Sequence, residues 1–392
     1  MKIEDLAFQR DKYKHLSDGE WRWMLQQVEG RERTADKLPT FAAMDDWWYP
    51  VRLSCEQCSS EETARYKAYL VKSLEFRGGR HFADITGGYG VDAYFLSAAF
   101  EHTDYVEQNE ELCRIAKHNK GLWVRGDELR DISVHNSTAE KFLQTAGQYD
   151  LIYLDPARRD SYGGKVFRLE DCTPNVVELL PTLLAHLTPE GRILLKLSPM
   201  LDLTQALLRL TPDTGHLAWD VYVVAIKNEV KEVLLLSGGT GLITAVDLAK
   251  KEQAFVFTRE EESNSEAIPM RSTINNEALY YLYEPNAAIL KAGAYKSVGQ
   301  RFGLQKLDVN THLYCSDKLV PDFPGRVWRV KDEGTKGEKA NVLVRNYPLT
   351  PEQLKKKLHL RDGGTDYVIG CRVAGKPTLF FAERTEDIHP ES

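Results

Sequence analysis

A short glycine-rich turn between two apolar segments constrains the fold of this chain most. It lies in the stretch FADITGGYGVDAYF, from Phe82 to Phe95. Gly87, Gly88 and Gly90 occupy three of four consecutive positions, and residues without a Cβ let the backbone approach a bound ligand closely. The residues before the turn are typical of a buried strand end, and those after it have helical apolar spacing. The stretch therefore predicts a strand, a tight turn and a helix that together hold a nucleotide.

Two kinds of nucleotide fit this turn. Gly88, Gly90 and Ala93 satisfy the G-x-G-x-x-A pattern of dinucleotide-binding proteins, and Glu107 follows at about the distance expected for an NAD ribose carboxylate. Asp84 argues against this alternative, because a carboxylate just before the glycines repels a pyrophosphate. The same charge suits the ammonium and sulfonium groups of S-adenosylmethionine. We therefore favour the methyl donor.

The composition limits the class of protein and the number of domains. With 392 residues, 42% of them hydrophobic and 28% charged, the chain has the make-up of a soluble globular protein of two or three domains. Its N-terminus mixes charges from the first residues, and its longest apolar run, from Val221 to Ile226, is far below the ~18 residues that span a bilayer. We expect neither a signal peptide nor a membrane segment.

The cysteines and the net charge exclude further classes. Six scattered cysteines fit a cytoplasmic protein with reduced thiols. Cys55 and Cys58 form a lone C-x-x-C without a second pair, so we expect no metal site. A formal net charge of −7 argues against a protein that coats nucleic acid indiscriminately, although a local basic face is compatible with it.

The first 78 residues predict a helical segment. Residues 16–38 have helical apolar spacing, and a second helix is expected from Glu61 to Leu74, because serines and acidic residues cap its start. The aromatic sequence Trp47-Trp48-Tyr49-Pro50 lies between these helices. This loop either packs over the nucleotide site or docks the segment onto the rest of the chain, and we favour docking.

From Arg80 onward, short apolar runs alternate with helical patterns. The expected strands are HFADIT, TDYVEQ, ISVHNS, YDLIYL and GRILLKL, with helical patterns at 91–100, 109–119, 138–145 and 174–187. Such alternation predicts βαβ units and a parallel sheet covered on both faces. Two further strands, WDVYVVAI and KEVLLLSG, are separated only by KNEV, which is too short for a crossover helix, so they must be antiparallel. The fold class is therefore α/β, with a mostly parallel sheet of seven strands.

On these features the segment from Asp84 to Asp155 resembles the class I S-adenosylmethionine-dependent methyltransferases, which have a Rossmann-like fold. Their first motif, D-x-x-x-G-x-G, is met by DITGGYG, with Thr86 where many members have glycine. The resemblance implies that Glu107 binds the ribose hydroxyls and that the adenine lies near Ser137, where the family often has an acid. The implied cofactor-binding residues are Asp84, Thr86, Gly87, Gly88, Gly90, Glu107, Gln108, Ser137 and Asp155.

The fourth expected strand ends in the sequence DPARR, at the carboxyl edge of the sheet where α/β proteins bind their ligands. A carboxylate and the carbonyl group beside a proline are acceptors that can orient an amine, with its lone pair aimed at a methyl group. The segment resembles the D/N-P-P-aromatic motif of amino-group methyltransferases and the D-P-P-W stretch of trimethylguanosine synthases, from which Ala157 and Arg158 depart. The expected catalytic residues are Asp155, Pro156 and Arg158.

Residues within and after this motif are candidates for substrate binding. A guanidinium plane stacks on a base or holds a phosphate, so the two arginines fit an RNA substrate, and the loop that follows predicts a substrate lid. The expected substrate-binding residues are Arg158, Arg159, Tyr162 and Arg168. The alternative for the two arginines is a solvated loop, or an ion pair with Asp160 or Glu170.

The C-terminal part predicts smaller modules. After an expected hairpin, LITAVDLA and QAFVFT, the polar linker REEESNSEAIP indicates a boundary near residue 263. Residues 263–325 fit two helices and a strand, whereas residues 326–392 fit strands around one helix capped by Thr350 and Gln353, then an acidic tail. Between residues 326 and 376 there are 12 Lys or Arg against 6 Asp or Glu. This basic surface either faces RNA or is an ordinary solvated face.

Over most of its length the chain resembles a bacterial set of methyltransferase-like proteins. The matching segments are SCEQCSSEETARYKAYLV, DPARR, YEPNAAILKAG and DGGTDYVIG. The resemblance implies a methyltransferase domain at 79–262, a THUMP-like module at 263–325 and a ferredoxin-like module at 326–392. Because true THUMP domains guide RNA-modifying enzymes, it also implies methylation of a base in structured RNA, such as tRNA or rRNA. A methyltransferase for a protein or small molecule and a non-catalytic RNA-binding scaffold are the alternatives.

Overall fold

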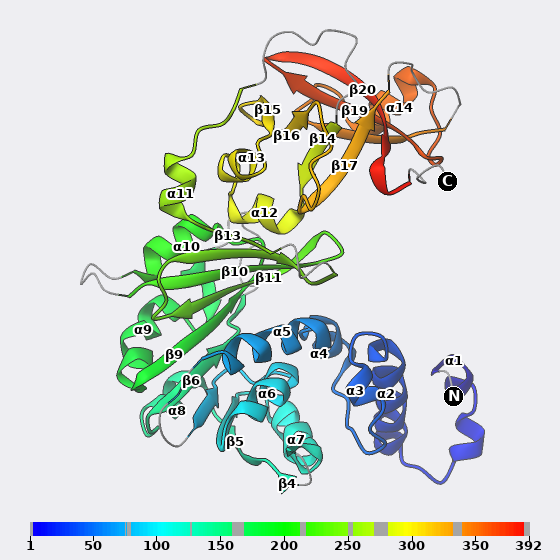
Figure 1. Ribbon diagram of the computed structural model, residues 1–392. Helices are drawn as coiled ribbons and strands as arrows, with labels where there is room; N and C mark the ends of the chain where they lie inside the picture. The colour runs from blue at the N-terminus through cyan, green and yellow to red at the C-terminus, as the bar shows by residue number, and fades with distance from the viewer. Residues whose placement is uncertain are drawn as a thin grey trace. The chain divides into compact units, whose positions relative to one another are not determined.

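A computed structural model describes residues 3–74, 76, 80–125, 128–158, 168–211, 217–249, 254–269, 281–331 and 339–387 (Figure 1). The chain divides into two compact units. The first unit comprises residues 1–219 and 234–239, and the second comprises residues 220–233 and 240–392. None of the helices in these described ranges is both long and apolar enough to cross a bilayer.

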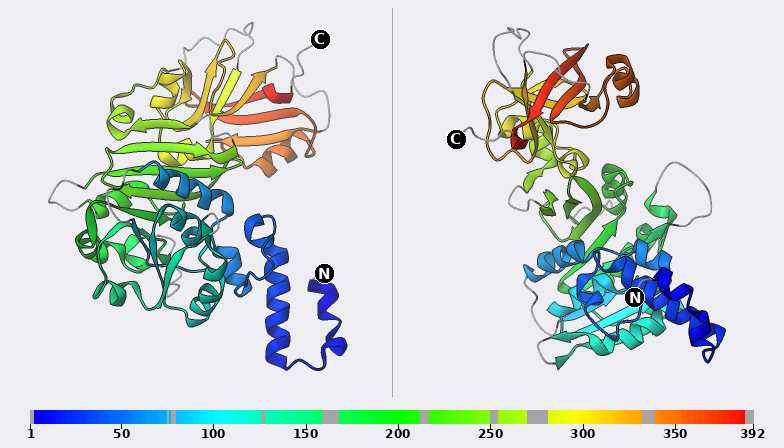
Figure 2. Two further views of the ribbon diagram at one scale, coloured as in Figure 1. Left: turned by 60° about the horizontal axis from the view of Figure 1, so that its bottom comes forward. Right: turned by 90° about the vertical axis from the view of Figure 1, so that its right-hand side faces the viewer.

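The first unit begins with helices, as the sequence predicted. These are α1 (Ile3–Ala7), α2 (Asp18–Thr34), α3 (Pro39–Ala42), α4 (Arg52–Gln57) and α5 (Glu61–Lys72), with a 3-10 helix at Arg10–Tyr13. At the start of α2, the Ser17 hydroxyl accepts a hydrogen bond from the Glu20 backbone N–H, and the Glu20 carboxylate accepts one from the Ser17 N–H. Figure 2 shows the two helical stretches nearest the N-terminus, in dark blue, side by side.

The five expected parallel strands form the centre of the first unit. They are β1 (His81–Asp84), β2 (His102–Glu107), β5 (Asp131–Asn136), β6 (Tyr149–Leu154) and β9 (Leu187–Leu197). Their order is β9-β6-β1-β2-β5, and every pair among them is parallel. Because parallel strands end at one edge of a sheet, the residues that follow β6, β1, β2 and β5 are brought together there.

Helices connect these strands, as the βαβ pattern requires. They are α6 (Val91–Leu96), α7 (Glu110–Asn119), α8 (Ala139–Leu143), α9 (Val176–Ala185) and α10 (Leu203–Leu210). Short elements complete the unit: β3 (Val124–Arg125), β4 (Glu128–Leu129), β7 (Ala157–Arg158), β8 (Cys172–Thr173) and 3-10 helices at Ser97–Ala99, Lys120–Leu122 and Leu169–Asp171. Helix α7 packs on β2 and β5, while α5 packs on α6. The Rossmann-like fold is thus confirmed.

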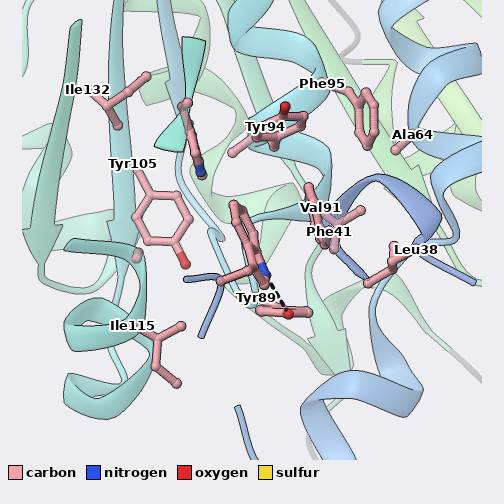
Figure 3. Close-up of a cluster of buried hydrophobic side chains, with 14 of the residues drawn as sticks. Leu38, Phe41, Ala64, Tyr89, Val91, Tyr94, Phe95, Tyr105, Ile115 and Ile132 are labelled. Atoms are coloured by element: carbon pink, nitrogen blue, oxygen red, sulfur yellow. Dashed lines mark hydrogen bonds between the residues drawn. The ribbon is translucent and has the colours of Figure 1, made fainter. Parts of the chain in front are cut away.

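An aromatic cluster docks the N-terminal segment onto the glycine turn. The Phe41 and Trp47 rings stack with their centroids 4.0 Å apart, and Phe41 also meets the ring of Tyr94 edge-on. The indole N–H of Trp47 donates a hydrogen bond to the Tyr89 hydroxyl at 2.7 Å, drawn as the dashed line in Figure 3. All four side chains are at least nine-tenths buried. The docking interpretation of the aromatic loop is therefore confirmed.

Four more strands follow in the chain and belong to the same sheet, and the boundaries between the two units fall within or just after the first two of them. These are β10 (Trp219–Ile226), β11 (Glu229–Ser237), β12 (Leu242–Asp247) and β13 (Phe255–Thr258), in the order β13-β12-β10-β11. Lys227 and Asn228 join β10 to β11 with φ values of 50° and 64°, as a two-residue antiparallel hairpin requires. Strand β12 pairs with β10, so the sheet has nine strands instead of the expected seven, whereas the β12–β13 hairpin is confirmed.

A second sheet holds the C-terminal residues. Its seven strands are β14 (Tyr281–Pro285), β15 (Gln305–Asp308), β16 (Thr311–Ser316), β17 (Gly325–Val330), β18 (Asn341–Arg345), β19 (Asp366–Val373) and β20 (Lys376–Arg384). The order is β15-β16-β14-β17-β20-β19-β18, and β14 pairs antiparallel with β17. The two predicted C-terminal modules therefore share one continuous sheet.

Helices of the second unit are short. They are α11 (Arg259–Asn264), α12 (Ala287–Ala292), α13 (Ser297–Arg301) and α14 (Pro351–Leu358), with a 3-10 helix at Thr385–Asp387. Thr350 and Gln353 form the expected capping box at the start of α14, each side chain bonding the backbone N–H of the other residue.

Candidate active site

A cavity of about 300 Å³ lies at the carboxyl edge of the first unit's sheet. The residues that follow β1, β2, β5 and β6 all contribute to its wall. All nine residues assigned to the cofactor line it: Asp84, Thr86, Gly87, Gly88, Gly90, Glu107, Gln108, Ser137 and Asp155. The structure thus brings together, around one cavity, residues that lie between positions 84 and 155 of the sequence.

The glycine turn has the backbone geometry that its composition predicted. Gly88 and Gly90 adopt φ values of 59° and 86°, in the left-handed region that favours glycine. Gly87 has an ordinary φ, but a Cβ there would lie 2.5 Å from the Cε2 atom of Tyr105. The Tyr105 hydroxyl in turn donates a hydrogen bond to the Gly88 carbonyl. The ring of Tyr105 therefore packs directly against the glycine turn.

Glu107 at the end of β2 has a fixed carboxylate. One carboxylate oxygen accepts the Gly88 N–H at 2.8 Å and the other accepts the Asn109 N–H at 2.7 Å. Each oxygen retains a second lone pair, and the side chain lines the cavity. A carboxylate held in this way can accept hydrogen bonds from two neighbouring hydroxyl groups of a ribose.

Asp84 at the end of β1 is only 1% exposed, and its Oδ1 accepts the Thr86 N–H at 3.0 Å. Burial raises the pKa of Asp84 well above its usual range, and the negative charges of Asp92, Asp155 and Glu107 raise this pKa further. The sequence led us to expect a negatively charged wall at Asp84. Burial and these neighbouring charges therefore oppose ionisation of Asp84.

Asp155 is tied both to the glycine turn and to a neighbouring strand. Its backbone N–H donates to the Thr86 hydroxyl at 2.6 Å, so the threonine that departs from the usual motif joins β1 to β6. Its Oδ2 lies 2.5 Å from the ammonium nitrogen of Lys196 on β9. Sequence reasoning missed Lys196, whose only signal in the sequence is a lysine within the apolar run ILLKL.

A buried ion pair holds Asp92, which lines the cavity. The Lys67 ammonium, which is fully buried in α5, lies 3.1 Å from Asp92 Oδ1. Asp92 Oδ2 accepts hydrogen bonds from the Ser59 and Tyr153 hydroxyls, both at 2.7 Å. Burial alone would raise the pKa of Asp92, but Lys67, Lys196 and these two hydroxyls lower it below its usual value. None of these residues was identified from the sequence.

The expected catalytic and substrate residues are only partly placed. Pro156 follows Asp155 but does not line the cavity. The backbone of Arg158 pairs with Cys172 through β7 and β8, and Arg168 is exposed and lies outside the cavity wall. Arg159 and Tyr162 lie outside the described residues. Glu170, one proposed partner of the arginines, pairs with Arg209 at 3.1 Å.

The basic stretch of the second unit is partly neutralised. Arg326 and Arg345 both pair with the buried carboxylate of Glu284. Further internal pairs are Arg329–Glu383, Lys331–Asp366 and Lys355–Asp362. Less of the positive charge is therefore available to a nucleic acid than the composition suggested.

No cluster of three His, Cys, Asp or Glu that could hold a metal occurs among the described residues.

Comparison with known proteins adds three findings. A model for a ferredoxin-like domain matches residues 281–324, and a model for a THUMP domain-like family matches residues 323–384. Two Mycobacterium tuberculosis proteins, from strains CDC 1551 / Oshkosh and ATCC 25618 / H37Rv, carry the name uncharacterized S-adenosylmethionine-dependent methyltransferase. Each is 23% identical over 373 residues, which cover 90% of this chain and 92% of the relative.

The third finding is a solved structure. The crystal structure of a "putative methyltransferase" from Porphyromonas gingivalis W83 superimposes with a TM-score of 0.81 and 32% sequence identity. The alignment covers 94% of this chain and 92% of that protein. The family matches also correct one expectation, because the ferredoxin-like module precedes the THUMP-like one, the reverse of the order predicted from the sequence.

Proposed function

The chain belongs to the S-adenosylmethionine-dependent methyltransferases, and from this premise we propose that it methylates a base in structured RNA. The observation that carries the catalytic part of the proposal is the position of Asp155. It stands at the carboxyl end of β6, fixed by Thr86 and Lys196, and lines the same cavity as Glu107. An acceptor group beside Asp155 is thereby next to the cofactor site.

We assign the cofactor to the nine lining residues around Glu107 and the glycine turn. The fit is supported by the carboxylate of Glu107, which suits a ribose diol, and by the absence of a Cβ where the backbone must approach closely. The cofactor supplies an activated methyl group on a positively charged sulfur. Asp84 balances positive charge there, and its ionisation becomes favourable once that charge is present.

In this proposal Asp155 orients the acceptor, whereas Pro156, the other residue of the predicted pair, lies outside the cavity wall. Among the described residues only Oδ2 of Asp155 has a side-chain partner, Lys196, so Oδ1 is available to accept an N–H of an amino group. This directs the nitrogen lone pair away from the carboxylate. Asp155 then takes up the proton that the nitrogen loses once it carries the methyl group.

RNA as the substrate rests on the THUMP domain-like match, since that family name is associated with RNA-modifying enzymes. We propose that the second unit and the arginines after Asp155 anchor the polynucleotide, in a cytoplasmic enzyme whose catalytic domain spans residues 79–262. Lys356 and Lys357 of α14 are among the exposed cations of the basic stretch that could serve this purpose.

The experiment is methyl transfer from labelled S-adenosylmethionine to RNA from a strain that lacks the gene, followed by mass spectrometry of the nucleosides. We expect label in one nucleoside, and loss of label with Asp155→Ala. Asp131→Ala is the matched control, because this exposed carboxylate lies at the opposite, amino end of β5. No label in this RNA, with label in the protein or small-metabolite fraction of an extract of the same strain, would refute the RNA substrate. Retention of full transfer by Asp155→Ala would refute the role of Asp155.

A further inference from the structure

The N-terminal helical segment contributes directly to the cavity. Ser54, Gln57, Cys58 and Ser59, from the end of α4 and the junction with α5, line it. The junction is held in place because the Ser59 hydroxyl donates to Asp92 at 2.7 Å. The sequence predicted only a docked appendage, so this wall requires a role of its own.

The order of the strands indicates which end of the cofactor meets this wall. The following step rests on the cofactor placement proposed above. Glu107 at the end of β2 receives the ribose, and the residues after β5 receive the adenine. Given the strand order β6-β1-β2-β5, the remainder of the cofactor, including its amino-acid end, therefore extends toward β1 and β6. Ser59 is bonded to Asp92, which is also bonded to Tyr153 of β6, so the α4 wall lies at that end.

The amino-acid end of the cofactor carries an ammonium and a carboxylate, and the carboxylate needs hydrogen-bond donors. Four backbone N–H groups of the glycine turn are already used within the protein. Those of Thr86, Gly87, Gly88 and Gly90 donate to Asp84, Val106, Glu107 and Gly87, respectively. The Asp155 N–H donates to Thr86. The acidic groups near the turn suit the ammonium but repel a carboxylate.

Ser54 and Gln57 of helix α4 are donors in the cavity wall. A serine hydroxyl and a glutamine amide can both donate to a carboxylate. In the described part of the chain, neither side chain has a hydrogen bond to another protein group, although both line the cavity. We propose that Ser54 and Gln57 bind the α-carboxylate at the amino-acid end of the methyl donor, so that helix α4 is part of the cofactor site.

Calorimetry on the full chain tests this with two ligands. S-adenosylhomocysteine has the amino-acid end, whereas 5′-methylthioadenosine has the same adenosine and sulfur without it. For the double variant Ser54→Ala/Gln57→Ala we expect affinity for S-adenosylhomocysteine to fall about tenfold or more, as for lost hydrogen bonds to a charged group. Affinity for 5′-methylthioadenosine should stay within about twofold, because that ligand has no carboxylate to lose.

Two further variants separate the possible failures. Glu56→Ala is the matched control on α4, because Glu56 is exposed and pairs with Arg52, and it should change neither affinity. Glu107→Ala should weaken both ligands. If it weakens neither, the cofactor placement itself is wrong. If Glu107→Ala weakens both but the double variant weakens neither, or weakens both equally, the assignment of Ser54 and Gln57 is overturned.

Discussion

Replacing Lys67 by methionine should destabilise the first unit strongly. The ammonium of Lys67 is fully buried, and the Asp92 side chain is 11% exposed at a separation of 3.1 Å. Removing one partner of a buried ion pair leaves an uncompensated charge and typically costs about 3–5 kcal/mol. The hydroxyls of Ser59 and Tyr153 still donate to Asp92, so we expect the lower end, about 3 kcal/mol.

The loss of folding stability caused by Lys67→Met should depend on pH. In the wild type the pKa of Asp92 is lowered, so its contribution to stability is present above the unfolded-state pKa and is lost as the pH falls through the folded value. Without Lys67, burial dominates and raises this pKa. The Asp92 carboxylate then destabilises the folded state increasingly as the pH rises from the unfolded-state value. The deficit of Lys67→Met should therefore be larger at pH 8 than at pH 5.

The assay is urea unfolding, with and without S-adenosylhomocysteine. The transition that this ligand shifts belongs to the first unit, and the loss of stability is read from that transition. Lys67→Met/Asp92→Asn is the second variant, since it removes both charges and should recover a large part of the lost stability. A single-variant loss below about 1 kcal/mol, or equal losses for the single and double variants at every pH, would refute the view that this pair is a buried, mutually compensating one.

Two other predictions concern the cavity. Because the pKa of Asp84 is raised, binding of the cationic donor should release a proton, so affinity for S-adenosylmethionine should rise with pH. Asp84→Asn should abolish both effects, as measured by calorimetry in buffers of different ionisation enthalpy; an unchanged pH dependence in that variant would contradict the assignment. Gly87→Ala should lower stability by about 1–3 kcal/mol and weaken ligand binding, because the new Cβ meets the Tyr105 ring. Gly121→Ala is the control and should do neither, since a Cβ there has no neighbour within 4 Å among the described residues outside its own helical turn. Equal effects of the two variants would exclude this steric cause.

The cofactor side of the site was predictable because its signals are local. The spacing from Asp84 to Gly90 by itself specifies a strand end and a left-handed turn, and Glu107 follows at the end of the next strand of a regular alternation. The paired lysines were not predictable in this way. Lys196 meets Asp155 across 41 residues, and a single lysine in an apolar run reads as a solvent-facing residue until the neighbouring strands are known.

The C-terminal modules show a different limit. Both are mixtures of short strands and one or two short helices, so the pattern of elements does not distinguish a ferredoxin-like from a THUMP-like module, and the predicted order was reversed. Basic residues were also overinterpreted from composition. Only the structure shows that Arg326 and Arg345 neutralise the buried Glu284.

The pairing of β14 with β17 unites the two C-terminal modules. The family matches meet near residue 323, yet the hydrogen bonds of this strand pair run across that junction. A fragment ending at residue 324 would lose the strand that covers one side of β14, and a fragment beginning there would lose the partner on one side of β17. Each fragment would expose unpaired backbone donors and acceptors along a strand edge, and such edges promote self-association with other copies. The smallest piece worth expressing from this region therefore contains both modules.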